Sequence, residues 1–284
     1  MKMEASPPQD SRSRSFDQTV RPKQRSFEIL AILACCALSA CSRAPAGAPT
    51  PAAKGNAEVD YQAPPQVTSV RIVAGQVEIF GASTAGAVVR LARPDGPAGQ
   101  ATANASGRWV INTPASGQAQ LYGVSEVTAG RTLQSSGYLL VTPDGLGVVL
   151  RAGAGALVLS QPEPSRVTAF DIDRQGGAVV SGFGPPGTRI SIRVDGDKLG
   201  EGRTDAGGRF VLALTGPVNP GRHSLKVFGE AIDVAMTIDA SRASALTSGP
   251  YRAAMVGPHL RVDWMTPGGG EQTTWVYGQE IPAK

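Results

Sequence analysis

The sequence contains an internal repeat, and this repeat limits the possible folds more than any other feature. Residues 79–111 align without a gap on residues 180–212, which lie 101 positions later. The aligned pairs include four glycines and one aromatic residue: Gly81 and Gly182, Gly86 and Gly187, Gly99 and Gly200, Gly107 and Gly208, and Trp109 and Phe210. Self-similarity at a fixed period is the signature of a repeated structural unit. We therefore expect two tandem modules with the same fold.

Short runs of alternating apolar and polar residues predict that both modules are all-β. Ile190, Ile192 and Val194 alternate with polar residues, as in a strand with one buried face. No helical period of apolar residues persists after residue 41, and turn sequences such as Asp195-Gly196 separate the runs. The expected strands are 69–73, 76–80, 87–92, 108–112, 120–124, 138–142, 147–151 and 156–160 in the first module, and 167–173, 178–182, 188–194, 209–214, 223–228 and 233–239 in the second.

The segment 260–277 predicts a further hairpin whose aromatic residues share one face. A loop at 267–270 would place Trp264 opposite Thr273, so that Trp264, Trp275 and Tyr277 point to the same side. Such a face either covers the core of the second module or binds a ligand, because aromatic rings stack on sugars and anchor partner proteins. Trp264, Trp275 and Tyr277 are therefore candidate ligand-binding residues, and their accessibility decides between the two interpretations.

The N-terminal 40 residues predict an export signal. Arg21, Lys23 and Arg25 precede the apolar run 29–38, which is too short to span a bilayer. The run ends in Leu38-Ser39-Ala40-Cys41, which resembles the lipobox of bacterial lipoproteins. The resemblance implies cleavage before Cys41, lipid attachment to this cysteine, and a place in the bacterial cell envelope. Ser42 follows the cysteine in place of Asp, which in such lipoproteins favours the outer membrane, facing the periplasm. An ordinary secretory signal is the alternative.

The chain after the signal excludes several classes of protein. Cys35 and Cys36 leave with the signal, so no thiol remains for a disulfide or a metal site. Residues 41–284 carry 21 basic and 19 acidic side chains without a basic run, which argues against nucleic-acid binding. Residues 41–65 are rich in Ala, Pro, Gly and Thr and predict a flexible tether after the anchor.

No pattern of catalytic or metal-binding residues stands out in either module. His223 and His259 have no second ligand at metal-binding spacing, and there is no Gly-x-Ser-x-Gly motif. The acidic residues of the second module match no calcium loop, and we interpret them as turn and strand-edge residues; they are Asp171, Asp173, Asp195, Asp197 and Asp205. We therefore expect no catalytic residues, no metal and no cofactor.

The turn and strand motifs of the repeat resemble the bacterial immunoglobulin-like repeats of envelope and surface proteins. The motifs are Gly182, Pro186-Gly187-Thr188, Ile190-Ser191-Ile192, Asp195-Gly196, Gly200 and Thr204-Asp205-Ala206-Gly207-Gly208-Arg209-Phe210. The first module has a weaker copy, with Asn104 in place of Asp205. The resemblance implies two immunoglobulin-like sandwiches, to each of which we add an appended hairpin.

These features predict the following organisation and function. A signal (1–40) and a tether (41–65) precede module 1 (66–160), a proline-containing linker (161–166) and module 2 with its hairpin (167–279). We expect a non-enzymatic envelope lipoprotein that serves as a structural, adhesion or protein-binding module. A carbohydrate- or peptidoglycan-binding module is the alternative. The expected partners are the membrane, through the lipid, and either envelope proteins or cell-wall glycan.

Overall fold

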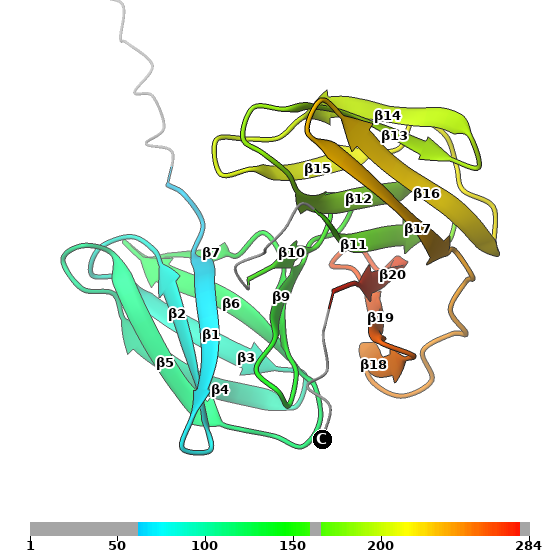
Figure 1. Cartoon of the computed structure of the whole chain (residues 1–284). Helices are drawn as coiled ribbons and strands as arrows, with labels where there is room; N and C mark the ends of the chain where they lie inside the picture. Colours follow the sequence, from blue (N-terminus) through cyan, green and yellow to red (C-terminus); the bar gives the residue numbers. More distant parts are fainter. Residues whose placement is uncertain (1–61, 160–165, 279–284) are drawn as a thin grey trace, which may run out of the picture. The chain divides into compact units, whose positions relative to one another are not determined.

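The computed structural model describes residues 62–159 and 166–278, which belong to one compact unit, Ala57–Lys284 (Figure 1). These residues form twenty strands in four sheets, and none of them is helical. No helix that could cross a membrane is therefore found in the described part of the chain. The predicted fold class is confirmed for the described residues, which are all-β and form two tandem immunoglobulin-like sandwiches.

Module 1 is a sandwich of a three-stranded sheet and a larger sheet. The small sheet has the order β1-β2-β5, and the larger one contains β4-β3-β6 with β7 paired to part of β6. The strands are β1 (Gln66–Val73), β2 (Gln76–Ala82), β3 (Val88–Arg93), β4 (Gly96–Thr102), β5 (Arg108–Pro114), β6 (Gln120–Thr128) and β7 (Arg131–Gln134). Before β1, Pro65 is buried and the Gln62 amide donates to the Thr84 hydroxyl, so the end of the predicted tether contacts this module at these two residues.

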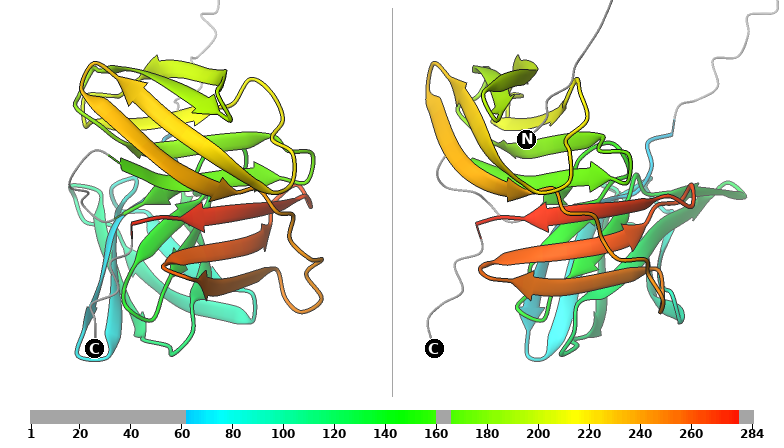
Figure 2. Two further views of the ribbon diagram at one scale, coloured as in Figure 1. Left: turned by 45° about the vertical axis from the view of Figure 1, so that its right-hand side comes forward. Right: turned by 90° about the vertical axis from the view of Figure 1, so that its right-hand side faces the viewer.

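Module 2 repeats the sandwich. One sheet contains β15-β12-β11, and the other has the order β14-β13-β16-β17 (Figure 2). The strands are β11 (Arg166–Asp173), β12 (Ala178–Phe183), β13 (Arg189–Val194), β14 (Asp197–Arg203), β15 (Arg209–Ala213), β16 (Arg222–Gly229) and β17 (Ile232–Asp239). The strands β3 and β4 of module 1 recur as β13 and β14 with the same 101-residue offset that the sequence shows.

The repeated glycine and aromatic residue form one packing unit in each module. Gly81 lies opposite Trp109 in the β2–β5 ladder, and Gly182 lies opposite Phe210 in the β12–β15 ladder. A Cβ atom added at Gly182 would lie 2.4 Å from the Phe210 ring, and one at Gly81 would lie 2.0 Å from the Trp109 ring. Each aromatic ring therefore lies across the bare backbone of its glycine, which explains why both residues recur together.

The predicted turn chemistry is also confirmed. In the turn before β5, the Asn104 side chain accepts hydrogen bonds from the amides of Ser106 and Arg108. Asp205 does the same for the amides of Gly207 and Arg209 in module 2. The two side chains cap equivalent turns, so the Asn-for-Asp difference between the modules keeps the same function.

Each module carries an appended three-stranded meander rather than the expected hairpin, and the two meanders extend different sheets. The meander of module 1 joins the sheet at β6, and the meander of module 2 joins the sheet at β11. The four-residue β7 leaves Gln120–Tyr122 of β6 free to pair with β8, whereas β17 pairs along the whole of β16. The strands are β8 (Tyr138–Val141), β9 (Gly147–Leu150), β10 (Leu157–Val158), β18 (Tyr251–Val256), β19 (His259–Met265) and β20 (Glu271–Val276).

The register of the C-terminal β19–β20 hairpin differs by one residue from the sequence prediction. Trp264 lies opposite Gln272, not Thr273. The reason is the loop, because the Thr266 amide bonds to Gly270 and leaves three loop residues instead of four. Since side chains alternate along a strand, a slip of one residue moves a whole strand's side chains to the other face of the sheet. Trp275 and Tyr277 therefore do not share a face with Trp264.

Two hydrophobic cores lie inside the sandwiches, and a third joins the modules. We call this third cluster the junction core. It contains Leu121, Leu140, Leu146, Val148, Leu150, Ala156 and Val158 from module 1 and its meander, and Ala169, Leu260, Val262, Trp264 and Val276 from module 2 and its meander. The sheet β15-β12-β11-β20-β19-β18 consequently packs against its own sandwich on one face and against module 1 on the other.

Candidate functional site

The structure buries all three candidate ligand-binding aromatic residues. Trp264 has no exposed surface, and Trp275 and Tyr277 are 3% and 5% exposed. The prediction that they share one face is wrong, because the register of the hairpin places them on two faces. Both faces are covered, so of the two interpretations that the sequence left open, the structure supports the one in which these residues cover a core.

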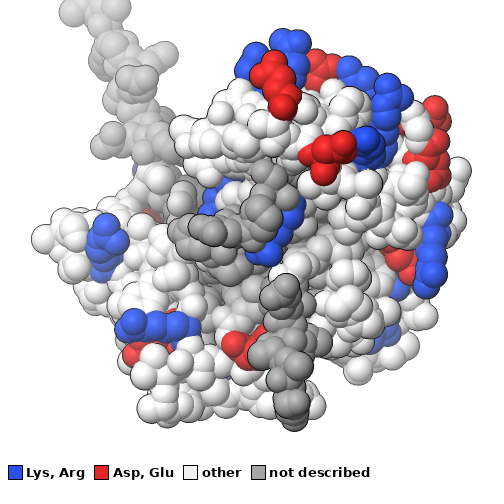
Figure 3. Space-filling model, viewed as in Figure 1, with Lys and Arg blue, Asp and Glu red and all other residues white. Residues whose placement is uncertain are grey.

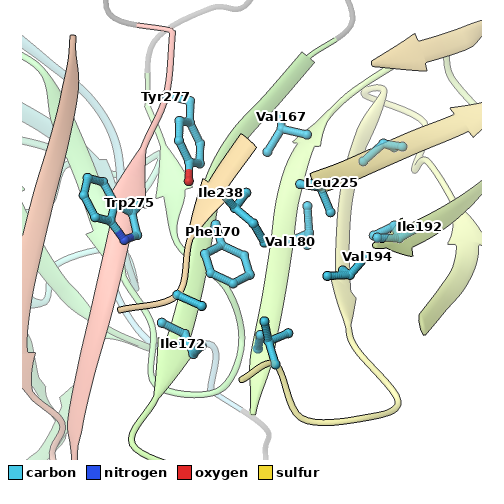
Figure 4. Close-up of a cluster of buried hydrophobic side chains, with 14 of the residues drawn as sticks. Val167, Phe170, Ile172, Val180, Ile192, Val194, Leu225, Ile238, Trp275 and Tyr277 are labelled. Carbon is cyan, nitrogen blue, oxygen red and sulfur yellow. The ribbon is translucent and has the colours of Figure 1, made fainter. Parts of the chain in front are cut away.

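Trp275 and Tyr277 belong to the core of module 2 (Figure 4). Arg261 lies over the Trp275 ring, and the His259 ring packs edge-on against Tyr277 with 4.8 Å between centroids. The Trp275 indole nitrogen and the Tyr277 hydroxyl have no hydrogen-bond partner among the described residues. Burial also raises the pKa of Tyr277. These contacts are those of core residues.

Trp264 lies in the junction core instead. Its ring packs edge-on against Tyr138 of β8, with 6.1 Å between centroids and an interplanar angle of 88°. Its indole nitrogen donates a 3.0 Å hydrogen bond to the Thr274 hydroxyl. Trp264 therefore helps to join the C-terminal meander to module 1.

A buried carboxylate completes this junction. The Asp171 side chain on β11 accepts hydrogen bonds from the Thr274 hydroxyl at 2.6 Å and the Gln272 amide at 3.0 Å. It also accepts a 2.7 Å hydrogen bond from the backbone amide of Ala156, in the turn between β9 and β10. Gln272 in turn accepts from the Gly153 amide of the same turn. Asp171 thus bonds the two modules to each other through buried groups.

The β9–β10 turn approaches module 2 closely at Gly155. The φ angle of Gly155 is +70°, and an added Cβ would lie 2.5 Å from the Ser181 hydroxyl of β12. The Arg151 side chain, at the start of this turn, donates from Nε to the Gly155 carbonyl at 2.8 Å. Only glycine combines this backbone conformation with so close an approach, so the turn is shaped to contact the module 2 sheet.

Burial raises the pKa of Asp171 from 3.8 to about 6. Removal of the carboxylate from water is the largest effect. The hydrogen bonds from Thr274, Ala156 and Gln272 and the charge of Arg151 partly oppose the shift. The ionised form of Asp171 is therefore held in the junction at the expense of stability.

A groove of about 930 Å³ lies beside the junction core, and we call it the junction groove. Module 1 contributes the β3–β4 turn, the segment before β6 and the loop after β8, and the C-terminal meander contributes β18 and the chain before it. The Tyr251 hydroxyl bridges the two sides by donating to the Ala119 carbonyl at 2.9 Å. The lining residues are Arg93, Pro94, Asp95, Gly117–Gln120, Thr142, Pro143, Asp144, Leu146, Leu246–Met255 and Leu260.

Both arginines in the described lining of the junction groove are paired with carboxylates. Arg93 bonds to Asp95 at 2.9 Å, and Arg252 bonds to Asp263 at 2.8 Å. The remaining charged residue of the described lining, Asp144, accepts a hydrogen bond from Thr142. The groove therefore presents no free cation from these residues that would attract an anionic ligand.

The acidic residues of module 2 do not converge. Asp173 and Asp205 cap turns, and Asp195 accepts from the Ser224 amide and bonds to His223 at 2.6 Å. These positions confirm the interpretation as turn residues, but for Asp171 that interpretation is wrong. No group of three or more His, Cys, Asp or Glu side chains that could hold a metal ion occurs in residues 62–159 and 166–278.

Cys41, the predicted point of lipid attachment, and the signal 1–40 lie outside the described residues, as does most of the tether and of the linker. Their assignments and the domain boundaries stay predictions.

No protein-family model and no curated protein matches the chain. Solved structures that are similar in part include the following two. A "Biofilm associated protein - BSP domain" matches with 13% identity and a TM-score of 0.23, and the match covers 64% of this chain and 30% of that chain. A "Central Fibronectin-III array of RIM-binding protein" matches with 14% identity and a TM-score of 0.25, over 75% of this chain and 88% of that chain. Neither superposes closely, so function has to be inferred from the residues of this chain.

Proposed function

We propose that the protein is a lipid-anchored envelope lipoprotein whose two modules act together as a non-catalytic protein-binding unit. Cys41 is the point of lipid attachment, and the tether carries the modules away from the membrane. The junction groove is the place where a partner protein binds.

The observation that supports this proposal is the composition of the groove walls. Residues of module 1 and of the C-terminal meander line the same groove. The junction core and the Asp171 hydrogen bonds join these two walls. A binding site built from both modules would explain why the protein has two modules, which a spacer alone would not. Binding sites are also often found where domains meet.

Glycan binding through the predicted aromatic face is not part of the proposal. Stacking on a sugar ring requires an accessible aromatic face. Trp264, Trp275 and Tyr277 are buried in two different cores.

Membrane fractionation tests the anchor. We expect Cys41→Ser to move the protein from the membrane fraction to the soluble fraction, because the thiol that carries the lipid is lost. Cys36→Ser, in the predicted signal, is the matched control and should leave fractionation unchanged. Unchanged membrane association of Cys41→Ser would contradict the anchor.

Site-specific photocrosslinking in intact cells tests the groove. A photoreactive residue in place of the exposed groove residue Gln118 should give a discrete crosslinked band with one protein. The same residue in place of Thr237, which is exposed on β17 and remote from the groove lining, should not give that band. Equal crosslinking at both positions, or none at Gln118, would overturn the groove as the binding site.

A further inference from the structure

The strand β18 is an edge strand with an unpaired row of backbone groups. Its sheet has the order β15-β12-β11-β20-β19-β18, so β18 pairs with β19 and has no second neighbour among the described strands (Figure 2). In an antiparallel ladder, alternate residues bond to the neighbour and the others point away from it. The Met265 amide bonds to the Pro250 carbonyl, which sets this alternation. The amides and carbonyls of Tyr251, Ala253 and Met255 therefore point outward from the sheet.

Several other edges of the molecule are protected against strand pairing. β14 carries four charged residues, β4 and β5 contain proline, and β10 has two residues. Charged side chains gather over the sheet that contains β13, β14 and β16 (Figure 3). Charges, prolines and short strands are the usual means of preventing edge-to-edge association.

β18 lacks this protection. Its one charged residue, Arg252, is paired with Asp263 on β19. Its C-terminal residues Met255 and Val256 are 49% and 47% exposed, although both are large and apolar. An exposed apolar edge is a template on which another extended chain can add as a strand.

The same strand borders the junction groove. Tyr251, Ala253 and Met255 lie on the face of the sheet that carries Trp264, Val262 and Leu260, which is the face toward module 1. A chain added beside β18 would place every second side chain on this face, because side chains alternate across a strand. Those side chains would enter the groove, whose lining includes Leu146, Leu246 and Leu260.

We propose that the partner protein is bound through an extended segment that adds to β18 as a further antiparallel or parallel strand, with apolar side chains at alternate positions in the junction groove. This inference rests on the proposed function and names the chemistry of its partner. Backbone hydrogen bonds to Tyr251, Ala253 and Met255 would supply affinity, and the apolar lining would supply selectivity. Because both arginines of the groove are already paired with carboxylates, they favour an apolar bound segment over an anionic one.

A proline at position 255 provides a specific test. Proline lacks the amide hydrogen, and it is tolerated in an edge strand where that hydrogen faces solvent. Met255→Pro should therefore keep the β18–β19 ladder and remove one outward donor. Met255→Val is the matched control, because it changes the side chain and keeps the amide. Equal melting temperatures of the variants would show that both are folded.

The probe is a fluorescein-labelled nine-residue peptide with valine at alternate positions and threonine or lysine at the others, measured by fluorescence anisotropy on the mature protein. Binding should be similar for the wild type and Met255→Val and at least about tenfold weaker for Met255→Pro, which loses a hydrogen bond and gains a steric block. No binding at peptide concentrations up to about 1 mM, or equal binding by both variants, would overturn strand addition.

Amide hydrogen exchange gives a second measurement that needs no variant. Strand addition should slow exchange at Tyr251, Ala253 and Met255 and leave Arg252 and Ala254 nearly unchanged, because the latter already bond to β19. Protection without this alternation would overturn strand addition. The Gln118 crosslink could still form in that case, so failure of this inference is distinguishable from failure of the proposed binding site.

Discussion

The carboxylate of Asp171 on β11 accepts a 2.7 Å hydrogen bond from the backbone amide of Ala156 in the β9–β10 turn. This bond joins the second module to the meander of the first through a group that is 1% exposed. Buried polar groups are costly unless they are fully hydrogen-bonded, and Asp171 has three donors. The junction of the two modules is therefore specific as well as apolar.

We expect the stability of the protein to fall as the pH rises through the titration of Asp171. The pKa of this group is about 6 in the folded protein and near 3.8 unfolded, so the folded state binds the proton more tightly. Its stabilising contribution is present below pH 4 and is lost as the pH rises through 6, at up to about 1.4 kcal/mol per pH unit. Urea unfolding at a series of pH values measures this slope.

Asp171→Asn isolates that effect, because the amide does not titrate. The difference in unfolding free energy between the wild type and Asp171→Asn should change by roughly 2–2.5 kcal/mol between pH 4 and pH 7, because the carboxyl of the unfolded chain is already partly ionised at pH 4. Parallel pH profiles for the two proteins would show that the Asp171 pKa is not raised in the folded state.

Trp264→Ala should destabilise the protein by about 3–5 kcal/mol, because it leaves a large cavity in the junction core. Met265→Ala is the matched control on the next residue of β19. The Met265 side chain is 41% exposed, so its loss should change the free energy by less than about 0.5 kcal/mol. Urea denaturation measures both, and similar small values would contradict the buried position of Trp264.

The native tryptophan fluorescence should resist quenching by iodide. The sequence has three tryptophans, and Trp109, Trp264 and Trp275 are all 3% exposed or less. An ionic quencher needs collision with the indole, which burial prevents. We expect the quenching constant to rise several-fold on unfolding in urea. Strong quenching of the native protein would contradict this burial and favour the ligand-binding interpretation of the aromatic residues.

Gly182→Ala should destabilise module 2 by about 2–4 kcal/mol. The added Cβ would lie 2.3 Å from the Arg166 carbonyl oxygen and 2.4 Å from the Phe210 ring, so the β11–β12–β15 ladder would have to shift. Gly268→Ala is the control, since nothing lies within 4 Å of its added Cβ. Thermal unfolding of the two variants measures the difference, and equal melting temperatures would refute the glycine–aromatic packing unit.

Much of the fold could be predicted from local features of the sequence. Alternating apolar residues identify β13, because Ile190, Ile192 and Val194 are buried while Arg189 and Arg193 are exposed. Asn104 and Asp205 identify their turns, because each side chain bonds to amides within four residues. The strands β4, β7, β14 and β18 were not predicted. β4 begins with Gly96 and Pro97, which are residue types depleted in strands, and it forms a strand because it pairs with β3.

The sequence by itself determined the all-β class, the duplication, the turns and the alternation along most strands, because each depends on residues close together in the chain. Only the tertiary structure decided the site. One loop residue at 267–270 reversed the faces of Trp264 and Trp275, and Asp171 acquired its role from Ala156, Gln272 and Thr274. The contacts to Gln272 and Thr274 join segments about 100 residues apart, and the contact to Ala156 joins two different modules. Local sequence patterns carry no information about which of these groups will meet when two modules pack together.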